Sequence, residues 1–271
     1  MNVAERIAPR TRRPSLAQGF AVQCRVIGAL LMREMHTRYG RDNIGYLWLV
    51  AEPLMFGSII ALLHAGQASN EGEMNPVAFA VTGYSVFIIF RGIVNRSDGA
   101  LDGNLPLLYH KMVTVLDITI ARALLELGGT ICAFIILLCA AIFLGYTQLP
   151  ARPLWLMLGI AYVFWISFAL SMIITGGTYD RHTLSRLVHP ATYFMMPLSG
   201  AFIAVGWVPE PYRSYMLWIP LPHIFEMVRY GQFETAPSEY FSLGYATAWN
   251  AVLTLLGLRI AASTRKRIHL Q

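Results

Sequence analysis

The chain has 271 residues, of which 56% are hydrophobic and only 13% are charged, and its formal net charge is +6. A typical soluble domain carries about 25% charged residues, so this composition excludes an ordinary soluble globular protein. The positive charge lies in short segments beside long apolar runs, which indicates anionic membrane lipid rather than nucleic acid as its partner. We therefore predict a polytopic membrane protein that binds no nucleic acid.

Residues 1–44 precede the first long apolar run and form the predicted cytoplasmic N-terminal segment. Within it, residues 16–39 place an apolar side chain on one helical face about once per turn. The stripe consists of Phe20, Cys24, Ile27, Leu31 and Met35. We expect an amphipathic helix in the membrane interface, with its basic face toward headgroups or water. A docking surface for another protein is the alternative.

Six apolar runs follow, each close to the roughly 20 helical residues that cross about 30 Å of hydrocarbon. They cover residues 45–66, 78–95, 121–146, 153–176, 187–206 and 241–262. The runs are continuous and lack the apolar and polar alternation of membrane β-barrels. The predicted fold class is therefore all-α, with a six-helix transmembrane domain over residues 45–262 and a basic cytoplasmic tail over residues 263–271.

The distribution of arginine predicts the orientation, because lysine and arginine stay preferentially in cytoplasmic loops. Basic residues gather before the first span, after the second and fourth spans, and in the tail: Arg6, Arg10, Arg12, Arg13, Arg25, Arg33, Arg38, Arg41, Arg96, Lys111, Arg181, Arg186, Arg265, Lys266 and Arg267. The opposite loops hold only Arg152, Arg213 and Arg229 among several glutamates. Both termini should therefore be cytoplasmic.

Three charged residues fall inside the predicted spans, where charge is costly and usually functional. Glu52 lies about 10 Å from the cytoplasmic boundary, and Arg91 and Glu126 lie at roughly 6 Å, so the three share one layer in this prediction. We interpret them either as a structural ion pair or as a polar collar at the cytoplasmic mouth that attracts an anionic ligand. Pro53, next to Glu52, adds a local break and allows a bend.

The loop over residues 96–117 carries a short amphipathic pattern. Leu105 and Leu108 alternate with polar and charged residues that include Asp102, His110 and Lys111. This pattern predicts a short cytoplasmic helix, with a solvated connector as the alternative.

The most irregular segment covers residues 207–237. Its five prolines, Pro209, Pro211, Pro220, Pro222 and Pro237, divide it into two short predicted helices over residues 212–219 and 223–232. Each is too short to span a bilayer but apolar enough to enter it, so a re-entrant helical hairpin is expected. A cap of interface helices outside the bilayer is the alternative. Under either interpretation Glu226 and Arg229 lie one helical turn apart and can pair.

Two motifs in this order resemble one family. The first is Arg33-Glu34-Met35-His36-Thr37-Arg38-Tyr39-Gly40-Arg41, followed by Leu47-Trp48 and Glu52-Pro53. The second is Pro222-His223-Ile224-Phe225-Glu226 with Arg229-Tyr230-Gly231. Together with six spans they resemble the permease subunits of type-2 ABC exporters for polysaccharides, especially the capsular-polysaccharide (KpsM-like) branch.

The resemblance implies partners as well as a fold. It implies a homodimeric channel in the bacterial inner membrane, two separate ABC ATPase subunits that bind ATP and magnesium, and export of a lipid-linked polysaccharide. In the capsule branch it further implies a periplasmic co-polymerase-like protein and an outer-membrane export channel. It does not separate a capsular substrate from O-antigen or teichoic acid glycans.

The sequence agrees with a motor on another chain. A Walker A loop ends in Gly-Lys-Ser/Thr, whereas the two lysines, Lys111 and Lys266, do not follow glycine. We therefore predict no cofactor, no metal and no catalytic residue on this chain.

The resemblance also implies working residues. Contacts that transmit ATPase closure are expected from Arg33, Glu34, Arg38, Arg41, Asp102, Leu105, Leu108, His110 and Lys111. The substrate conduit and a periplasmic gate are expected from Glu52, Arg91, Glu126, Tyr212, Tyr215, Trp218, Phe225, Glu226, Arg229 and Tyr230. Aromatic rings suit this role because the C–H-rich face of a sugar can stack on them without one fixed register.

Three other classes compete with an exporter. A membrane-embedded glycan enzyme needs clustered acids, histidines or phosphate-binding arginines near one interface, and the seven histidines are well separated in sequence. A secondary transporter should show internal repeats and coupling charges at the midplane, and no repeat is visible. A purely structural scaffold is the third alternative.

Overall fold

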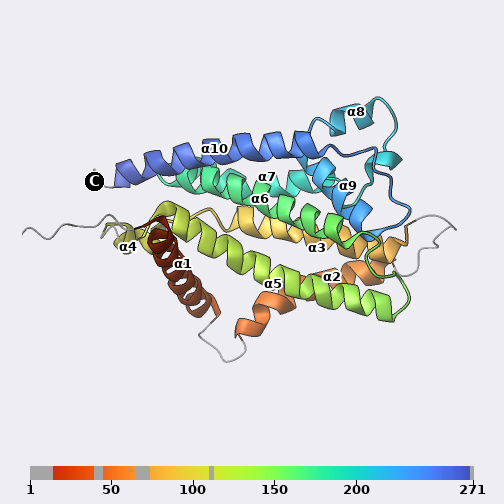
Figure 1. Cartoon of the computed structure of the whole chain (residues 1–271), viewed down its shortest axis with the longest axis horizontal. Coiled ribbons are helices and arrows are strands. Elements are labelled where there is room, and N and C mark those ends of the chain that lie inside the picture. The colour runs from red at the N-terminus through yellow and green to blue at the C-terminus, as the bar shows by residue number, and fades with distance from the viewer. Residues whose placement is uncertain (1–14, 40–44, 65–73, 110–112, 269–271) are drawn as a thin grey trace, which may run out of the picture.

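The computed structural model describes residues 15–39, 45–64, 74–109 and 113–268, and all regular elements in this part of the chain are helices. They form an elongated bundle (Figure 1). The elements are α1 (Leu16–Tyr39), α2 (Gly45–His64), α3 (Pro76–Asn95), η2 (Asp102–Asn104), α4 (Leu105–Tyr109), α5 (Val115–Phe143), α6 (Pro153–Thr178), α7 (His182–Leu198), η3 (Val205–Trp207), α8 (Tyr212–Met216), α9 (Pro220–Gln232) and α10 (Leu243–Ile268). The predicted all-α class is confirmed.

Four of the described helices are long and apolar enough to cross a membrane: α2, α3, α5 and α6. They correspond to the first four predicted spans. The predicted fifth span is represented by α7, which has only 17 residues. The predicted sixth corresponds to α10, which has 26 residues and carries three basic residues in its last turn.

Local sequence explains where several helices begin. Asn75 caps α3 by accepting hydrogen bonds from the backbone N–H groups of Val77 and Ala78, at 3.0 and 3.4 Å. Thr114 and Asp117 form a reciprocal capping box at the start of α5, which satisfies two backbone donors that the first turn leaves free. Proline stands in the first turn of α3, α6 and α9, where its missing N–H costs nothing.

The structure corrects several predicted boundaries. Helix α5 begins at Val115 rather than Ala121, because the capping box lies inside the loop predicted over residues 96–117. Helix α7 ends at Leu198 rather than Gly206, since Gly200 adopts φ +80° and turns the chain. Helix α10 continues to Ile268, so most of the predicted tail is helical. Helix α2 runs through Pro53 without a break in the helix.

Helix α3 is the centre of the bundle. Buried residues make up 83% of its most apolar 18-residue stretch, against 6% of the corresponding stretch of α2. The core around α3 includes Phe87, Phe90 and Ile93, together with Ile166 of α6 and Phe225 of α9. Helix α10 lies along α6 (Figure 1), and hydrogen bonds such as Trp165 Nε1 to Thr254 Oγ1 (2.9 Å) join these two helices. The apolar side chains of α2 are largely exposed, as expected of a surface that faces lipid or another chain.

Helix α1 has the predicted bounds, and the residues of its predicted apolar stripe are exposed or half-buried. Phe20 and Cys24 are exposed, whereas Leu30 and Glu34 are buried. The helix packs against α5, and Gln23 donates to Asp117 of α5 at 3.1 Å. Polar side chains therefore face inward here because α5 supplies polar partners for them.

The segment after α7 contains the two short helices that the prolines predict. Helix α8 is exposed, while α9 is buried from Leu221 to Arg229 and packs against α6 and α3. Both lie at the end of the bundle opposite α1 and α4 (Figure 1).

Gly83 permits the closest approach between α3 and the segment after α7. A Cβ atom at this position would overlap the backbone carbonyl of Ala201. Gly83→Ala is therefore expected to lower the free energy of unfolding by about 1–3 kcal/mol, measured by thermal denaturation in detergent. In the matched change Gly128→Ala on α5 the new Cβ meets nothing within 4 Å, so stability should stay the same or rise slightly. Equal stability of the two variants would contradict this packing.

Candidate coupling network and outer cluster

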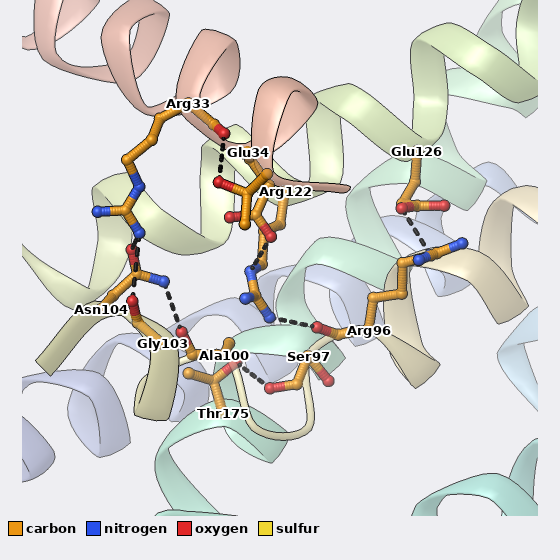
Figure 2. A network of polar contacts seen from close by, with 11 residues as sticks. Arg33, Glu34, Arg96, Ser97, Ala100, Gly103, Asn104, Arg122, Glu126 and Thr175 are labelled. Carbon is orange, nitrogen blue, oxygen red and sulfur yellow. Dashed lines mark hydrogen bonds and ion pairs between the residues drawn. The ribbon is translucent and has the colours of Figure 1, made fainter. Parts of the chain in front are cut away.

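A polar network lies at the end of the bundle where α1, α4 and the last turn of α10 meet (Figures 1 and 2). We call it the coupling network, and its charged and amide members are Arg33, Glu34, Arg96, Asn104, Arg122 and Glu126. On its α1 side, Arg33 donates to the side-chain oxygen of Asn104 and to the carbonyl of Gly103. Asn104 in turn donates to the carbonyl of Ala100 at 2.9 Å. Helix α1 is thereby tied to the loop that precedes α4.

Arg122 of α5 joins α1 to the end of α3. Its Nε lies 2.9 Å from Glu34 Oε1, and its Nη1 donates to the carbonyl of Arg96 at 3.0 Å. Figure 2 shows the guanidinium of Arg122 between these two partners. Both side chains of the ion pair are largely buried, so solvent screens the pair less than a surface pair. One side chain thus connects three helices.

Arg96 extends the network along α5. Its Nε lies 2.7 Å from Glu126 Oε1, and the Glu126 side chain is buried. The sequence placed Glu126 in one layer with Arg91 and Glu52. The structure instead pairs Glu126 with an arginine at the C-terminal end of α3, which matches the ion-pair interpretation of this carboxylate.

Arg91 makes a different contact. Its Nη2 donates to the hydroxyl of Tyr193 at 2.6 Å, and its guanidinium carbon lies 4.3 Å from the centre of the Tyr193 ring. Tyr193 belongs to α7 and is 56% exposed. Glu52 on α2 is also exposed. Of the three predicted collar residues, Arg91 and Glu52 therefore reach the surface of this chain, and Glu126 lies inside it.

The loop between α3 and α4 is fastened to α6. Thr175 of α6 donates to the carbonyl of Ser97 at 3.0 Å, and the Ser97 hydroxyl donates to the carbonyl of Val94 at 2.6 Å. The cavity beside Ser97, Thr175 and Arg122 measures only about 10 Å³, close to the minimum that holds one water molecule. The coupling network is therefore a tightly packed contact between helices and leaves no room for a ligand.

The loop also packs by apolar contact. Leu108 of α4 is 3% exposed and belongs to a cluster with Leu30 of α1 and Ile268 of α10. Leu108 therefore anchors α4 to α1 and α10 by apolar packing. Asp102 is exposed and Leu105 is half-buried. The side chain of Arg38, together with Arg41, His110 and Lys111, lies outside the described residues.

The C-terminal end of α6 is held to α10 at the same end. Asp180 pairs with Arg267 at 2.9 Å. Burial raises the pKa of the Tyr179 phenol above its usual value of 10, because it disfavours the charged phenolate. Electrostatic repulsion from Tyr109, Asp180 and Asp102 raises this pKa further. Tyr179 therefore remains protonated at physiological pH and keeps a hydroxyl donor beside these carboxylates.

The opposite end of the bundle holds a second cluster, which we call the outer cluster. It consists of Glu226 and Arg229 of α9 and the backbone groups that they bind. The predicted pair of Glu226 and Arg229 is confirmed, with 2.7 Å between Glu226 Oε1 and Arg229 Nη1 and both side chains at most 3% exposed. Glu226 also accepts from the backbone N–H of Val205 at 2.8 Å. Arg229 donates to the carbonyls of Gly200 and Ala201. Helix α9 is thus bonded to the turn that follows α7.

The aromatic residues predicted for the gate fall into two groups. Tyr212, Tyr215 and Trp218 are more than 60% exposed. Phe225 is 1% exposed and lies in the core. Tyr230 is half-buried against Arg152, whose guanidinium carbon lies 4.1 Å from the centre of the Tyr230 ring.

Histidine, cysteine and carboxylate side chains are dispersed over the described part of the chain. Within it no three histidine, cysteine or carboxylate side chains gather into a group that could hold an ion.

The sequence profile described as ABC-2 type transporter matches residues 25–233, from within α1 to the residue after α9. The matched residues include the coupling network and the outer cluster. The chain belongs to the ABC-2 type transporter family.

Named relatives of this ABC-2 transporter chain align along almost its whole length. The capsule polysaccharide export inner-membrane protein CtrC of Neisseria meningitidis is 36% identical over 258 residues, which cover 95% of this chain and 97% of the relative. The protein of the same description, BexB, from Haemophilus influenzae is 35% identical over 255 residues, or 94% and 96% of the two chains. The polysialic acid transport protein KpsM of Escherichia coli is 30% identical over 254 residues, or 89% and 94%.

Sequence reasoning missed several residues that organise this ABC-2 chain. Arg122, Arg96 and Asn104 complete the coupling network, and Tyr193 holds Arg91. One signal was available, because Arg122 and Glu126 stand four residues apart and therefore share a face of α5. Tyr193 and Asn104 gave no comparable signal.

Proposed function

We propose that this ABC-2 transporter chain is the membrane-spanning permease subunit of an ATP-driven exporter. Its substrate in this proposal is a lipid-linked, acidic capsular polysaccharide that crosses the bacterial inner membrane. The supporting observation is the similarity, over about nine-tenths of the chain or more, to relatives named for capsule polysaccharide export and polysialic acid transport. Export of O-antigen or teichoic acid glycans is the alternative, and a membrane-embedded glycan enzyme is a more distant one.

The proposed topology has six spans with both termini in the cytoplasm. Beyond the four helices long and apolar enough to cross, α10 has 26 residues, about 39 Å of helix, and packs along α6. Helix α7 and the turn after it form the remaining crossing, which is the fifth in chain order. The basic last turn of α10, with Arg265, Lys266 and Arg267, belongs on the cytoplasmic side by the positive-inside rule. Helix α1 then lies in the cytoplasmic interface.

The proposed assembly supplies what this chain lacks. A second copy completes the conduit, and two ABC ATPase subunits bind ATP and magnesium at the cytoplasmic end. A periplasmic co-polymerase-like protein and an outer-membrane export channel continue the path. The exposed apolar side chains of α2, such as Trp48, Phe56 and Leu63, support burial of this helix against the second copy or lipid.

Energy transfer is proposed to use the coupling network. Exposed groups of the α4 region, Asp102 and Tyr109, face the ATPase. A displacement of this loop passes to α1 through Asn104 and Arg33, and from α1 to α5 and α3 through Glu34 and Arg122. The coupling network is suited to transmit this motion, because tightly packed helix interfaces shift between discrete arrangements.

The exporter is tested by isolating the complex. The tagged chain should co-purify with an ATPase, and ATP hydrolysis in proteoliposomes should increase when the host's lipid-linked glycan is added. Deletion of the gene should cause a lipid-capped polymer to accumulate in the cytoplasm. An enzyme, a secondary transporter or a scaffold would show neither ATPase recruitment nor glycan-stimulated hydrolysis.

Charge reversal at Arg91 tests the proposed collar. Arg91→Glu should block export in a normally assembled transporter, because it removes the contacts with Tyr193 and repels an anionic glycan or its phosphate-bearing end. Export is measured as surface glycan per assembled complex. Arg186→Glu, an exposed position on α7, changes the net charge equally and should leave export intact. Unchanged export in Arg91→Glu would remove the collar from the mechanism.

A further inference from the structure

A cavity of about 260 Å³ opens beside the outer cluster. It lies next to Glu226 of α9, Trp207 of η3, and Thr235 and Tyr240 of the segment that leads to α10. Small-molecule pockets in proteins usually measure about 300–1,000 Å³, so this cavity has room for one ring rather than a longer ligand. None of the coupling residues lines it.

Glu226 supplies the cavity wall with a hydrogen-bond acceptor of fixed position. Glu226 is 2% exposed, and its Oε1 accepts from both Val205 N and Arg229 Nη1. Its Oε2 makes no hydrogen bond within the described part of the chain, while Glu226 itself lines the cavity. A carboxylate oxygen only accepts. A ligand must therefore present a hydrogen-bond donor here, and an ionised carboxylate or phosphate, which only accepts, cannot pair with this oxygen.

Two aromatic residues, Trp207 and Tyr240, line the same cavity as Glu226. Trp207 stacks on Phe79 with ring centres 4.7 Å apart, and the guanidinium carbon of Arg229 lies 4.4 Å from the centre of the Phe79 ring. Trp207 is nevertheless 58% exposed. The guanidinium carbon of Arg213 lies 5.5 Å from the centre of the Tyr240 ring. Both rings are thus held by packing while they line the cavity.

We propose that this cavity is an extracytoplasmic subsite that binds one sugar ring of the exported glycan through its uncharged, hydroxyl-bearing face. The inference rests on the proposed export function and adds a specific contact to it. A sugar hydroxyl donates to Glu226 Oε2, and the C–H face of the ring packs on Trp207 or Tyr240. Acidic groups of the glycan point away, because they have no proton to donate to Glu226 Oε2. The subsite holds the emerging chain after each step.

Accessibility during export tests the subsite. Cys24, Cys132 and Cys139 are exposed and are first replaced by serine. Thr235→Cys, inside the cavity, and Ser238→Cys, an exposed neighbour outside the lining, are then labelled with a membrane-impermeant maleimide. The labelling is done on spheroplasts with the complete transporter, with and without glycan synthesis.

Active export should slow labelling of Thr235→Cys and leave Ser238→Cys unchanged. Blocking glycan synthesis should restore the fast rate. Adding Trp207→Leu to Thr235→Cys should weaken the protection by roughly two- to tenfold, the loss expected for one aromatic contact.

Three results would overturn the subsite. The first is equal labelling of Thr235→Cys with and without export, in cells whose surface glycan shows that export is normal. The second is protection that persists without glycan synthesis, which would mean that a protein segment fills the cavity. The third is failure of both cysteines to react, which places the cavity on the wrong side of the membrane. Absence of glycan export by the unmodified transporter would instead count against the export function itself.

Discussion

Arg229→Leu should destabilise this chain more than removal of any other single charge in the coupling network or the outer cluster. The change leaves Glu226 buried without its counter-ion and frees the carbonyls of Gly200 and Ala201. Removing one partner of a buried ion pair typically costs about 3–5 kcal/mol. We therefore expect loss of most folded protein and of export, measured by thermal denaturation in detergent and by surface glycan.

A second variant distinguishes an uncompensated charge from lost packing. Glu226→Met combined with Arg229→Met should recover part of the stability, since apolar replacement of a buried pair is often nearly neutral. Recovery should be incomplete because Val205 N loses its acceptor, at about 1–3 kcal/mol for an unsatisfied buried group.

The matched control is Arg213→Leu. Arg213 and Glu210 are also three residues apart, but their atoms lie 3.8 Å apart and the Glu210 side chain is 58% exposed. The ion pair contributes about 1 kcal/mol or less, and Arg213 also donates to the carbonyl of Val208 at 3.0 Å. Because Arg213→Leu leaves no buried carboxylate without its counter-ion, it should cost less than Arg229→Leu. If Arg229→Leu costs no more than this control, the outer cluster does not hold α9 in place.

The sequence predicted those elements whose signals are local. Pro153 and the apolar run after it placed the start of α6 correctly, because both features lie within one segment. The start of α5 was missed because Thr114 and Asp117 form its capping box inside a polar loop. The end of α7 was missed because the apolar pattern continues past Gly200, whose positive φ turns the chain.

The same distinction applies to the two clusters. The pairing of Glu226 and Arg229 was predictable, because residues three apart on a helix share a face. The pairing of Arg122 with Glu34 was not, since it depends on how α1 packs against α5. Gln23 and Glu34 on the packed face of α1 lie outside its predicted apolar stripe, so no local sequence signal indicated their contacts with α5.

Arg122→Ala should uncouple ATP hydrolysis from transport. The side chain is the shared partner of Glu34 on α1 and of the Arg96 carbonyl at the end of α3. Hydrogen bonds to charged groups contribute about 1.5–3 kcal/mol, so losing them from the transport-competent state predicts roughly a ten- to hundredfold fall in coupling. The measured quantity is glycan exported per ATP hydrolysed in proteoliposomes that contain the assembled complex.

Three controls show whether the lower export ratio of Arg122→Ala comes from the coupling network rather than from misfolding. Arg122→Ala must still assemble with its ATPase and elute as a single species. Arg25→Ala removes an exposed arginine from α1 and should keep the normal ratio. Glu34→Ala combined with Arg122→Ala should be no worse than Arg122→Ala alone, because residues of one network have non-additive effects. A normal export ratio in assembled Arg122→Ala would show that motion from the ATPase reaches α3 and α5 by another route.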